Sequence, residues 1–169
     1  MSTSSNKQLK GIAGVHFVVA VLSRLGYVAL PTIRNLKSFD IVAFKTDLTK
    51  TFYLQIKSTD RKSGGFPVMT FSKEANADNY KEELKEKIGS DKNLFYVFVS
   101  LSNDVREMPN FYIVPAKAVW ESIASRIKQE LENKPKMSLV GQLMAWGYYG
   151  IEQSGGEKYK NNWGILEQK

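Results

Sequence analysis

Residues 39–57 read FDIVAFKTDLTKTFYLQIK and form the most informative stretch of the sequence. Its two ends, residues 39–44 and 51–57, are rich in the β-branched and aromatic residues that favour strands. The segment between them, residues 45–50, is polar and has the length of a hairpin connection. We therefore predict two neighbouring strands joined by a hairpin.

This hairpin would bring three polar side chains together. Asp40 lies near the start of the first strand, and Gln55 and Lys57 lie at the end of the second. Because residues two apart in a strand project from the same face, Gln55 and Lys57 share a face beside Asp40. Carboxylate and amide oxygens can hold a divalent cation, and the ammonium can lie near the water that attacks a phosphate.

The rest of the chain alternates between helical and strand-like patterns. We predict helices over 8–25 and 72–88, a helix of about 18 residues from Pro115, and a short helix over 157–166. Further strands are predicted over 27–30, 66–71, 93–101 and 111–114. The sequence thus predicts one α/β domain over residues 1–169, with a mixed sheet of four to five strands flanked by helices. Residues 139–169 are expected to form a C-terminal extension packed on it.

The positive charge is concentrated in the first part of the chain. Residues 1–65 carry ten Lys or Arg against three Asp, whereas the remaining residues carry fourteen charges of each sign. A basic region often marks a polyanionic partner, because each phosphate contact releases condensed counterions. We therefore expect DNA as the partner, and the alternative is a solubility charge that is unevenly distributed.

The composition excludes several classes of protein. The absence of cysteine removes disulfides, thiolate metal sites and cysteine nucleophiles. No apolar run reaches the length of about 18 residues that a membrane span needs. The first residues lead into a helical pattern rather than a signal-peptide core. We therefore expect a cytoplasmic protein without membrane association.

With its motifs in this order, the chain resembles the PD-(D/E)xK superfamily, the restriction-endonuclease-like nucleases. The resemblance lies in residues 11–14 (GIAG), 35–40 (NLKSFD) and 54–58 (LQIKS). Residues 111–115 (FYIVP) and 159–163 (YKNNW) are similar to features of small bacterial members. The resemblance implies a restriction-endonuclease-like core with the element order αβββαβ.

The resemblance also implies hydrolysis of a DNA phosphodiester with Mg²⁺ or Mn²⁺. Asp40 would bind the metal, and the main-chain carbonyl of Ile56 would be a further ligand. Gln55 takes the place of the more usual second acid and would be the third ligand. Lys57 would orient or deprotonate the attacking water and stabilise charge on the phosphate. Mg²⁺ needs only one or two carboxylates when substrate phosphates and waters complete its shell.

One position departs from the superfamily pattern. Members usually carry a glutamate on the first helix, just after a Gly-x-x-Gly-like start, but here Val15 follows Gly14. No glutamate precedes Glu74, and Asp40 is the first carboxylate in the chain. With Asp40 as the single negative charge at the site, divalent affinity should fall, which indicates a weakened or lost active site.

Further residues are candidates for the same site or for an interface. Phosphate contacts are expected from side chains near the predicted site: Arg34, Lys37, Ser58, Arg61 and Lys62. The alternative for each of them is an ordinary solvated surface. His16, the single histidine, is a candidate metal ligand or general base, or else a core or interface histidine. The strongly apolar first helix predicts a homodimer formed through it.

Three functions therefore remain open at this level. The first is a metal-dependent endodeoxyribonuclease with Asp40, Gln55 and Lys57 as its site. The second is a catalytically inactive protein of the nuclease fold that binds DNA or acts as a regulatory subunit. The third is a protein-interaction module.

Overall fold

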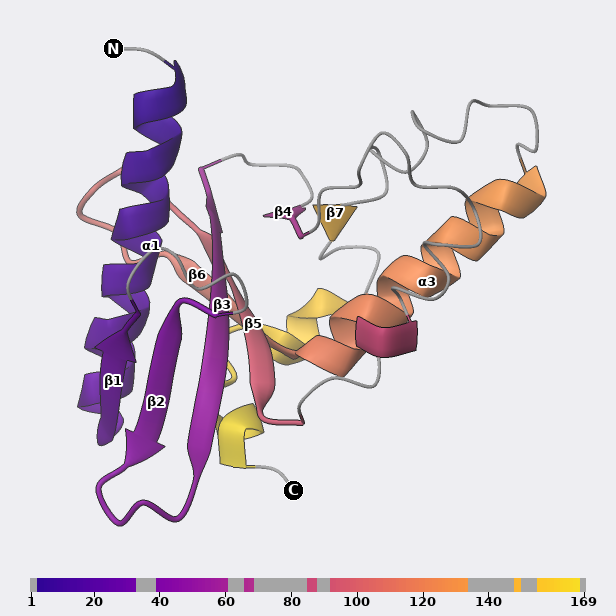
Figure 1. The fold of residues 1–169 in the computed structure, drawn as a ribbon. Helices are drawn as coiled ribbons and strands as arrows, with labels where there is room; N and C mark the ends of the chain where they lie inside the picture. Colours follow the sequence, from indigo (N-terminus) through magenta and orange to yellow (C-terminus); the bar gives the residue numbers. More distant parts are fainter. Residues whose placement is uncertain are drawn as a thin grey trace.

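The computed structural model describes residues 3–32, 39–60, 66–68, 85–87, 92–133, 148–149 and 155–167. The elements are, in chain order, α1 (Thr3–Arg24), β1 (Tyr27–Pro31), β2 (Ile41–Lys45), β3 (Thr51–Thr59), β4 (Phe66–Pro67), β5 (Leu94–Ser100), β6 (Asn110–Pro115), α3 (Ala116–Asn133), β7 (Tyr148–Tyr149) and the 3-10 helices η2 (Gly156–Tyr159) and η3 (Trp163–Glu167) (Figure 1). Residues 85–87 are also helical.

The main sheet has five strands in the order β1-β2-β3-β5-β6. β1, β2 and β3 form an antiparallel meander, β5 runs parallel to β3, and β6 returns antiparallel to β5. The short strands β4 and β7 pair separately. The prediction of an α/β fold with a mixed sheet is therefore confirmed.

Helix α1 covers one face of the sheet at β1, β2 and β3. Val18 and Leu22, four residues apart and thus on one side of the helix, are fully buried. We call the apolar cluster beneath this helix the α1-side core; its buried members are Val18, Leu22, Tyr27, Ile41, Ala43, Phe52, Leu54, Ile56, Phe95, Val97, Val99, Phe111, Ile113, Ile165 and Leu166. Alternate residues of β3 (Phe52, Leu54 and Ile56) belong to it, as the period of two in a strand requires.

Helix α3 covers the other face at the opposite end of the sheet, over β5 and β6 (Figure 1). Val119, Trp120 and Ile123 of this helix are buried against Tyr96 and Phe98 of β5. The predicted helix of about 18 residues after Pro115 is confirmed, because α3 has 18 residues. No helix among the described residues is long and apolar enough to cross a membrane.

A C-terminal strap, residues 155–167, closes the α1-side core. Ile165 and Leu166 are buried in that core, and Asn161 exchanges hydrogen bonds with Phe111 at the edge strand β6. Glu167 forms an ion pair with Lys45 (2.9 Å) and accepts a hydrogen bond from the hydroxyl of Tyr27. The strap therefore joins both edges of the sheet.

Several predicted element bounds differ from the observed ones. The strand predicted over 39–44 is observed as β2, which begins at Ile41, so Asp40 lies in a bend before the strand rather than within it. α1 begins at Thr3, five residues before the first residue of the predicted helix, because its polar first turns carry no apolar periodicity. The predicted short final helix is divided into η2 and η3. Only the first two residues of the strand predicted over 66–71 are observed in a strand, as β4 (Phe66–Pro67), among the residues described there. Most of the helix predicted over 72–88 lies outside the described residues.

Candidate functional site

Asp40 lies in a bend immediately before β2, where it joins three strands. Its main-chain N–H donates to the carbonyl of Leu54 in β3 (2.8 Å), and its carbonyl accepts from Thr32, just after β1 (2.8 Å). Because of the bend, the N–H and the C=O of Asp40 point to different neighbours, the N–H to β3 and the C=O to the end of β1. Asp40 is thus held by the backbone on both sides, which fixes where its carboxylate lies.

The carboxylate of Asp40 is engaged by β3. One oxygen, Oδ2, accepts a hydrogen bond from the Gln55 amide nitrogen (2.6 Å) and another from the main-chain N–H of Ile56 (2.7 Å). β2 has not yet begun at this level, so the carboxylate serves as the partner that a strand carbonyl would otherwise provide. The structure brings Asp40 and Gln55 together as the hairpin predicts.

Lys57 lies two residues farther along the same face of β3. Its amine is half-buried and forms no hydrogen bond or ion pair with any described residue. Burial lowers the pKa of this amine, the negative charge of Asp40 opposes that shift, and the positive charge of Lys7 adds to it. Lys57 is therefore a cation that is partly shielded from water, and its charge is only partly compensated by that of Asp40.

Tyr96 was not predicted from the sequence as a site residue, yet it lies next to the cluster of Asp40, Gln55 and Lys57. It lies opposite Gln55 in the parallel ladder of β3 and β5, and its ring packs edge-on against Trp120 (5.9 Å between centroids). Burial and the charge of Asp40 both raise the pKa of its hydroxyl. Tyr96 is thus a buried, uncharged neighbour of the site. Only the register between two strands separated by about forty residues places it there, and sequence patterns do not give that register.

Aromatic residues lie on the other side of the cluster. Phe39 packs against Tyr53 with their ring centroids 4.9 Å apart, and both side chains are half-buried. Tyr53 precedes Gln55 by two residues and therefore shares its face. Alternation in β3 was the available signal for Tyr53. Alternation along the strand predicted over 39–44 would instead place Phe39 on the face of Ile41, and the bend at Asp40, just before β2, is not marked in the sequence.

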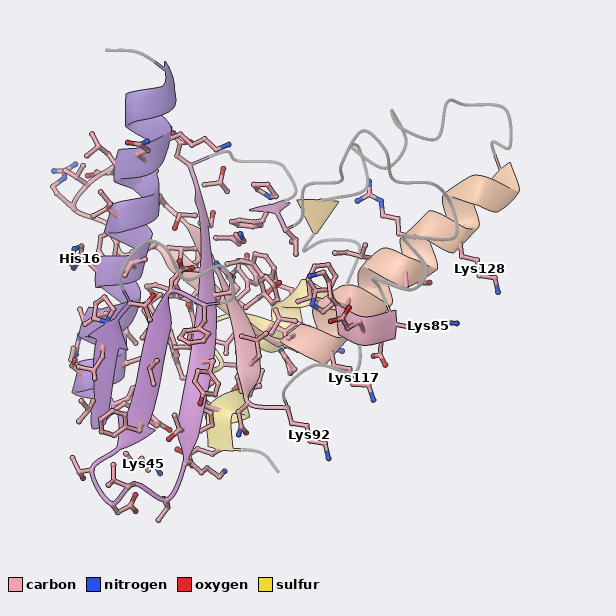
Figure 2. The ribbon with its side chains drawn as sticks, viewed as in Figure 1. His16, Lys45, Lys85, Lys92, Lys117 and Lys128 are labelled. Atoms are coloured by element: carbon pink, nitrogen blue, oxygen red, sulfur yellow. The ribbon has the colours of Figure 1, made fainter. Side chains whose placement is uncertain are left out.

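Two predicted residues lie away from this cluster. Ser58 faces α1, on the opposite side of the sheet from Lys57: its hydroxyl is buried with no hydrogen-bond partner among the described residues, and it lies against Gly14. His16 is exposed on the outer side of α1 (Figure 2), together with Ile12 and Leu9. The structure thus groups neither residue with Asp40, because α1 covers the sheet face that the site does not use.

Val15, the residue at the expected glutamate position, packs against the α1-side core. The predicted phosphate contacts Arg34, Lys37, Arg61 and Lys62 lie outside the described residues. The homodimer through α1 stays a prediction.

The donor set suits weak rather than tight metal binding. In the described part of the chain, no group of three His, Cys, Asp or Glu side chains could hold a metal ion. Asp40 contributes one carboxylate, and only its Oδ2 takes part in the hydrogen bonds to β3. In an antiparallel ladder the N–H and C=O of a residue face the same neighbour, so the Ile56 carbonyl also faces the side on which Asp40 lies. Asp40, Gln55 and Ile56 therefore supply oxygens that fit Mg²⁺ only when a phosphate and waters complete its shell.

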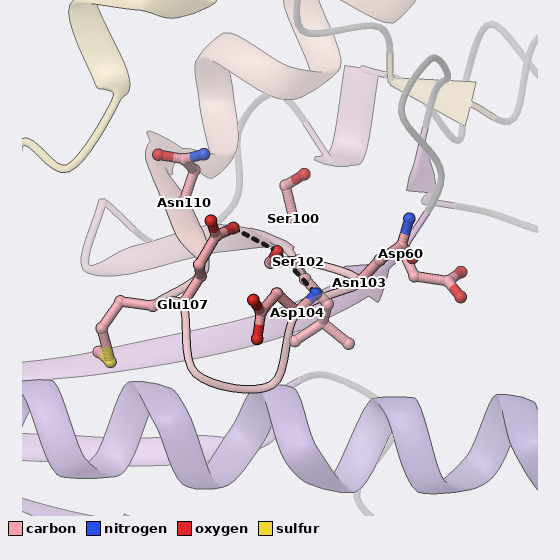
Figure 3. Close-up of a pocket in the computed structure, with 9 residues that line it drawn as sticks. Asp60, Ser100, Ser102, Asn103, Asp104, Glu107 and Asn110 are labelled. Carbon is pink, nitrogen blue, oxygen red and sulfur yellow. Dashed lines mark hydrogen bonds between the residues drawn. The ribbon is translucent and has the colours of Figure 1, made fainter.

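A separate pocket of about 410 Å³ opens where the parallel strands β3 and β5 end (Figure 3). It is lined by Asp60, Ser100, Leu101, Ser102, Asn103, Asp104, Glu107, Met108 and Asn110. Its acids already have partners: Asp60 pairs with Lys10 (2.5 Å), Asp104 with Arg106 (2.6 Å), and Glu107 accepts from the Ser102 hydroxyl (2.6 Å). The pocket contains none of Asp40, Gln55 and Lys57.

No protein-family model matches this sequence, and no curated protein is significantly similar to it.

Proposed function

We propose that this protein acts on DNA and hydrolyses a phosphodiester in a Mg²⁺-dependent reaction. The site of this reaction is formed by Asp40, Gln55 and Lys57. The observation that carries the proposal is the convergence of one carboxylate, one amide and one half-buried ammonium on neighbouring strands, with 2.6 Å between Asp40 Oδ2 and Gln55 Nε2. Each group has a chemical task in phosphate hydrolysis, and the ammonium lacks another partner among the described residues.

The topology supports the proposal. A helix, an antiparallel three-stranded meander and a further strand parallel to the third follow one another, which agrees with the arrangement that the nuclease resemblance leads us to expect. In this arrangement Asp40 stands where β2 begins, and Gln55 and Lys57 stand on β3. A restriction-endonuclease-like core is therefore part of the proposal.

The metal would be held by the carboxylate of Asp40, the amide oxygen of Gln55 and the carbonyl of Ile56. Bound there, Mg²⁺ would supply neutralisation of phosphate charge and a lowered pKa of a bound water. Gln55 also orients Asp40 through its amide nitrogen. Because the described residues of the site include a single carboxylate, that of Asp40, we expect appreciable metal affinity only when the DNA phosphate is present.

Lys57 would bind and position the phosphate. Its half-buried amine can donate hydrogen bonds to a non-bridging phosphate oxygen, where negative charge grows in the transition state. Tyr96, buried and uncharged, lies beside Gln55 on β5 and would shield this side of the site from water. A cation in such surroundings interacts with a phosphate more strongly than a lysine in bulk water.

A second candidate function is DNA binding without cleavage. The specific observation in its favour is the structural task of Asp40, which bridges β1 and β3 and accepts from the Ile56 N–H. A carboxylate retained for that reason would persist in a protein that no longer cuts. The missing first-helix glutamate favours this candidate too.

Replacement of Asp40 by Asn separates the two candidates. Asparagine keeps an oxygen acceptor for the Ile56 N–H while removing the charge, so the fold should persist. We expect purified wild type to nick a plasmid in the presence of Mg²⁺ or Mn²⁺ and Asp40→Asn to lose that activity. Asp47→Asn is the matched control, because Asp47 is an exposed acid of the hairpin turn between β2 and β3.

The two DNA-binding candidates predict different results in the same experiment. If the wild type nicks DNA and only Asp40→Asn fails, the hydrolase is supported. If wild type binds DNA without nicking it and Asp40→Asn binds equally, the binding scaffold is supported. If no salt-sensitive DNA binding occurs, both are refuted and a protein partner becomes the leading function.

A further inference from the structure

Half of one sheet face carries apolar side chains that no described helix covers. α1 contacts β1, β2 and β3 from one side, and α3 contacts β5 and β6 from the other. The alternate residues of β1, β2 and β3 that point away from α1 form what we call the open face: Val28, Leu30, Val42, Phe44 and Tyr53. Leu30 is 52% exposed, and the other four are half-buried.

The open face is continuous with the candidate site. Leu30, Val42 and Tyr53 are direct neighbours across the three strands, and Phe39 packs on Tyr53. From Tyr53, the next residues on the same face of β3 are Gln55 and then Lys57. Four residues of strand span about 13 Å. The pair of aromatic rings, tilted by 45° relative to each other, therefore lies within reach of the same nucleic-acid strand as the Lys57 ammonium.

The positive charge of Lys57, at one end of the open face, favours the binding of an anion. Lys57 is half-buried and is not ion-paired within the described part of the chain. Asp40, the described acid whose charge acts on Lys57, directs one oxygen to Gln55 and to the Ile56 N–H instead. An adjacent apolar and aromatic surface together with an unpaired cation is complementary to a base and its phosphate, rather than to an apolar peptide.

We propose that the open face binds unpaired nucleotides, with a base stacked on Phe39 and Tyr53 while a nearby phosphate contacts Lys57. The inference rests on the proposed function and narrows its substrate to DNA that is single-stranded at this place. In a duplex the faces of the bases are stacked on one another and are inaccessible to an aromatic side chain. In a single strand every base offers a face for stacking, whatever the sequence.

The test is the equilibrium binding of a fluorescent single-stranded oligodeoxynucleotide and of the same sequence as a duplex, measured by anisotropy without divalent cations. We expect the wild type to bind the single strand more tightly. Tyr53→Leu, which keeps an apolar side chain but removes the ring, should lose about ten-fold in affinity for the single strand. Tyr53→Phe keeps the ring and is the matched control that should retain it.

Two further measurements separate this inference from the hydrolase proposal. Thermal unfolding of Tyr53→Leu checks that the variant is folded, and Lys57→Met should reduce the salt dependence of single-strand binding by close to one phosphate contact. Asp40→Asn leaves Phe39, Tyr53 and Lys57 in place, so it should keep the preference for the single strand over the duplex. Absence of nicking by the wild type, with its preference for the single strand retained, would thus refute hydrolysis and leave this inference standing.

Two results would overturn the inference. Equal or tighter binding of the duplex, with Tyr53→Leu and the wild type indistinguishable, would show that the open face is not used, even if nicking occurs. Absence of DNA binding, with the wild type sedimenting as a dimer and folded Tyr53→Leu as a monomer, would show that a second copy of the chain covers the face.

Discussion

Gly14→Ala should destabilise the protein, although alanine is the better helix former. Gly14 lies in α1 at its closest approach to β3: a β-carbon placed there would be 1.8 Å from the hydroxyl oxygen of Ser58, 2.9 Å from its Cβ and 3.5 Å from Cγ2 of Ile56. Rotation of Ser58 can relieve the first contact but not the second. The helix must therefore move away from the strand.

The magnitude follows from two opposing effects. Alanine in place of glycine inside a helix gains about 1 kcal/mol, whereas an extra carbon in a well-packed core costs about 1–3 kcal/mol. Both effects apply at Gly14. The distance of 2.9 Å to Cβ of Ser58 is so short that the packing cost should exceed the gain in helix propensity. Gly11, three residues earlier in the same helix, is the matched control, because a β-carbon there would meet nothing within 4 Å. Gly11→Ala should show the helix gain alone.

The assay is urea denaturation of both variants, followed by circular dichroism. We expect Gly11→Ala to be more stable than Gly14→Ala by about 2 kcal/mol, or about 4–8 °C in Tm for a chain of this size. Ser58→Ala, which removes the hydroxyl but not Cβ, should restore part of the stability of Gly14→Ala. Equal stability of the two alanine variants would refute the packing argument, as would the absence of any coupling between positions 14 and 58.

Three further predictions concern the charged groups. Asp40→Ala should lose about 2 kcal/mol of stability in urea denaturation, because it leaves the Ile56 N–H without an acceptor. Asp40→Asn should lose less. Equal losses would contradict the role of the Asp40 side chain as the hydrogen-bond acceptor of the Ile56 N–H. Burial lowers the pKa of Lys57 in the folded state, so the unfolded chain binds more protons in the alkaline range and stability should rise there with pH. Lys57→Met should therefore be more stable than the wild type at pH 7, with a gain that shrinks as the pH approaches the usual lysine pKa; a gain that does not depend on pH would refute the burial cost. The Tyr27 hydroxyl and Lys45 hold the pKa of Glu167 below its usual range, so its contribution should be present at neutral pH and vanish as the pH falls through that lowered pKa. Glu167→Gln should therefore destabilise the protein at pH 7, and the destabilisation should shrink as the pH is lowered, which thermal unfolding over a series of acidic pH values checks.

The strand runs around Asp40 and Gln55 could be predicted because β-branched and aromatic residues in short stretches favour one structure strongly. The same alternation that grouped Gln55 with Lys57 also puts Ser58 on the other face, so the sequence itself contained the signal that separates Ser58 from the site. For His16, the outward position follows from the turn of the helix that buries Val18 and Leu22.

The environment of the site could not be predicted in the same way. Tyr96 borders Gln55 only because β5 pairs in parallel with β3 in one particular register, and a crossover connection leaves no local mark of register. The hydrogen bonds of Asp40 to Leu54 and Thr32 depend on a bend that is fixed by two other strands. Tertiary contacts, rather than local preference, decided both features.

The C-terminal strap has a consequence for the order in which the molecule folds. Tyr27 and Glu167 are 140 residues apart in the chain, yet they are hydrogen-bonded. Closing so long a loop costs entropy before any contact compensates for it, and contacts of high sequence separation form slowly. We therefore expect the meander of β1, β2 and β3 to assemble with α1 first and the strap to dock last. Amide hydrogens of η3 should then exchange faster than those of α1, even though Leu166 is as deeply buried as Leu22.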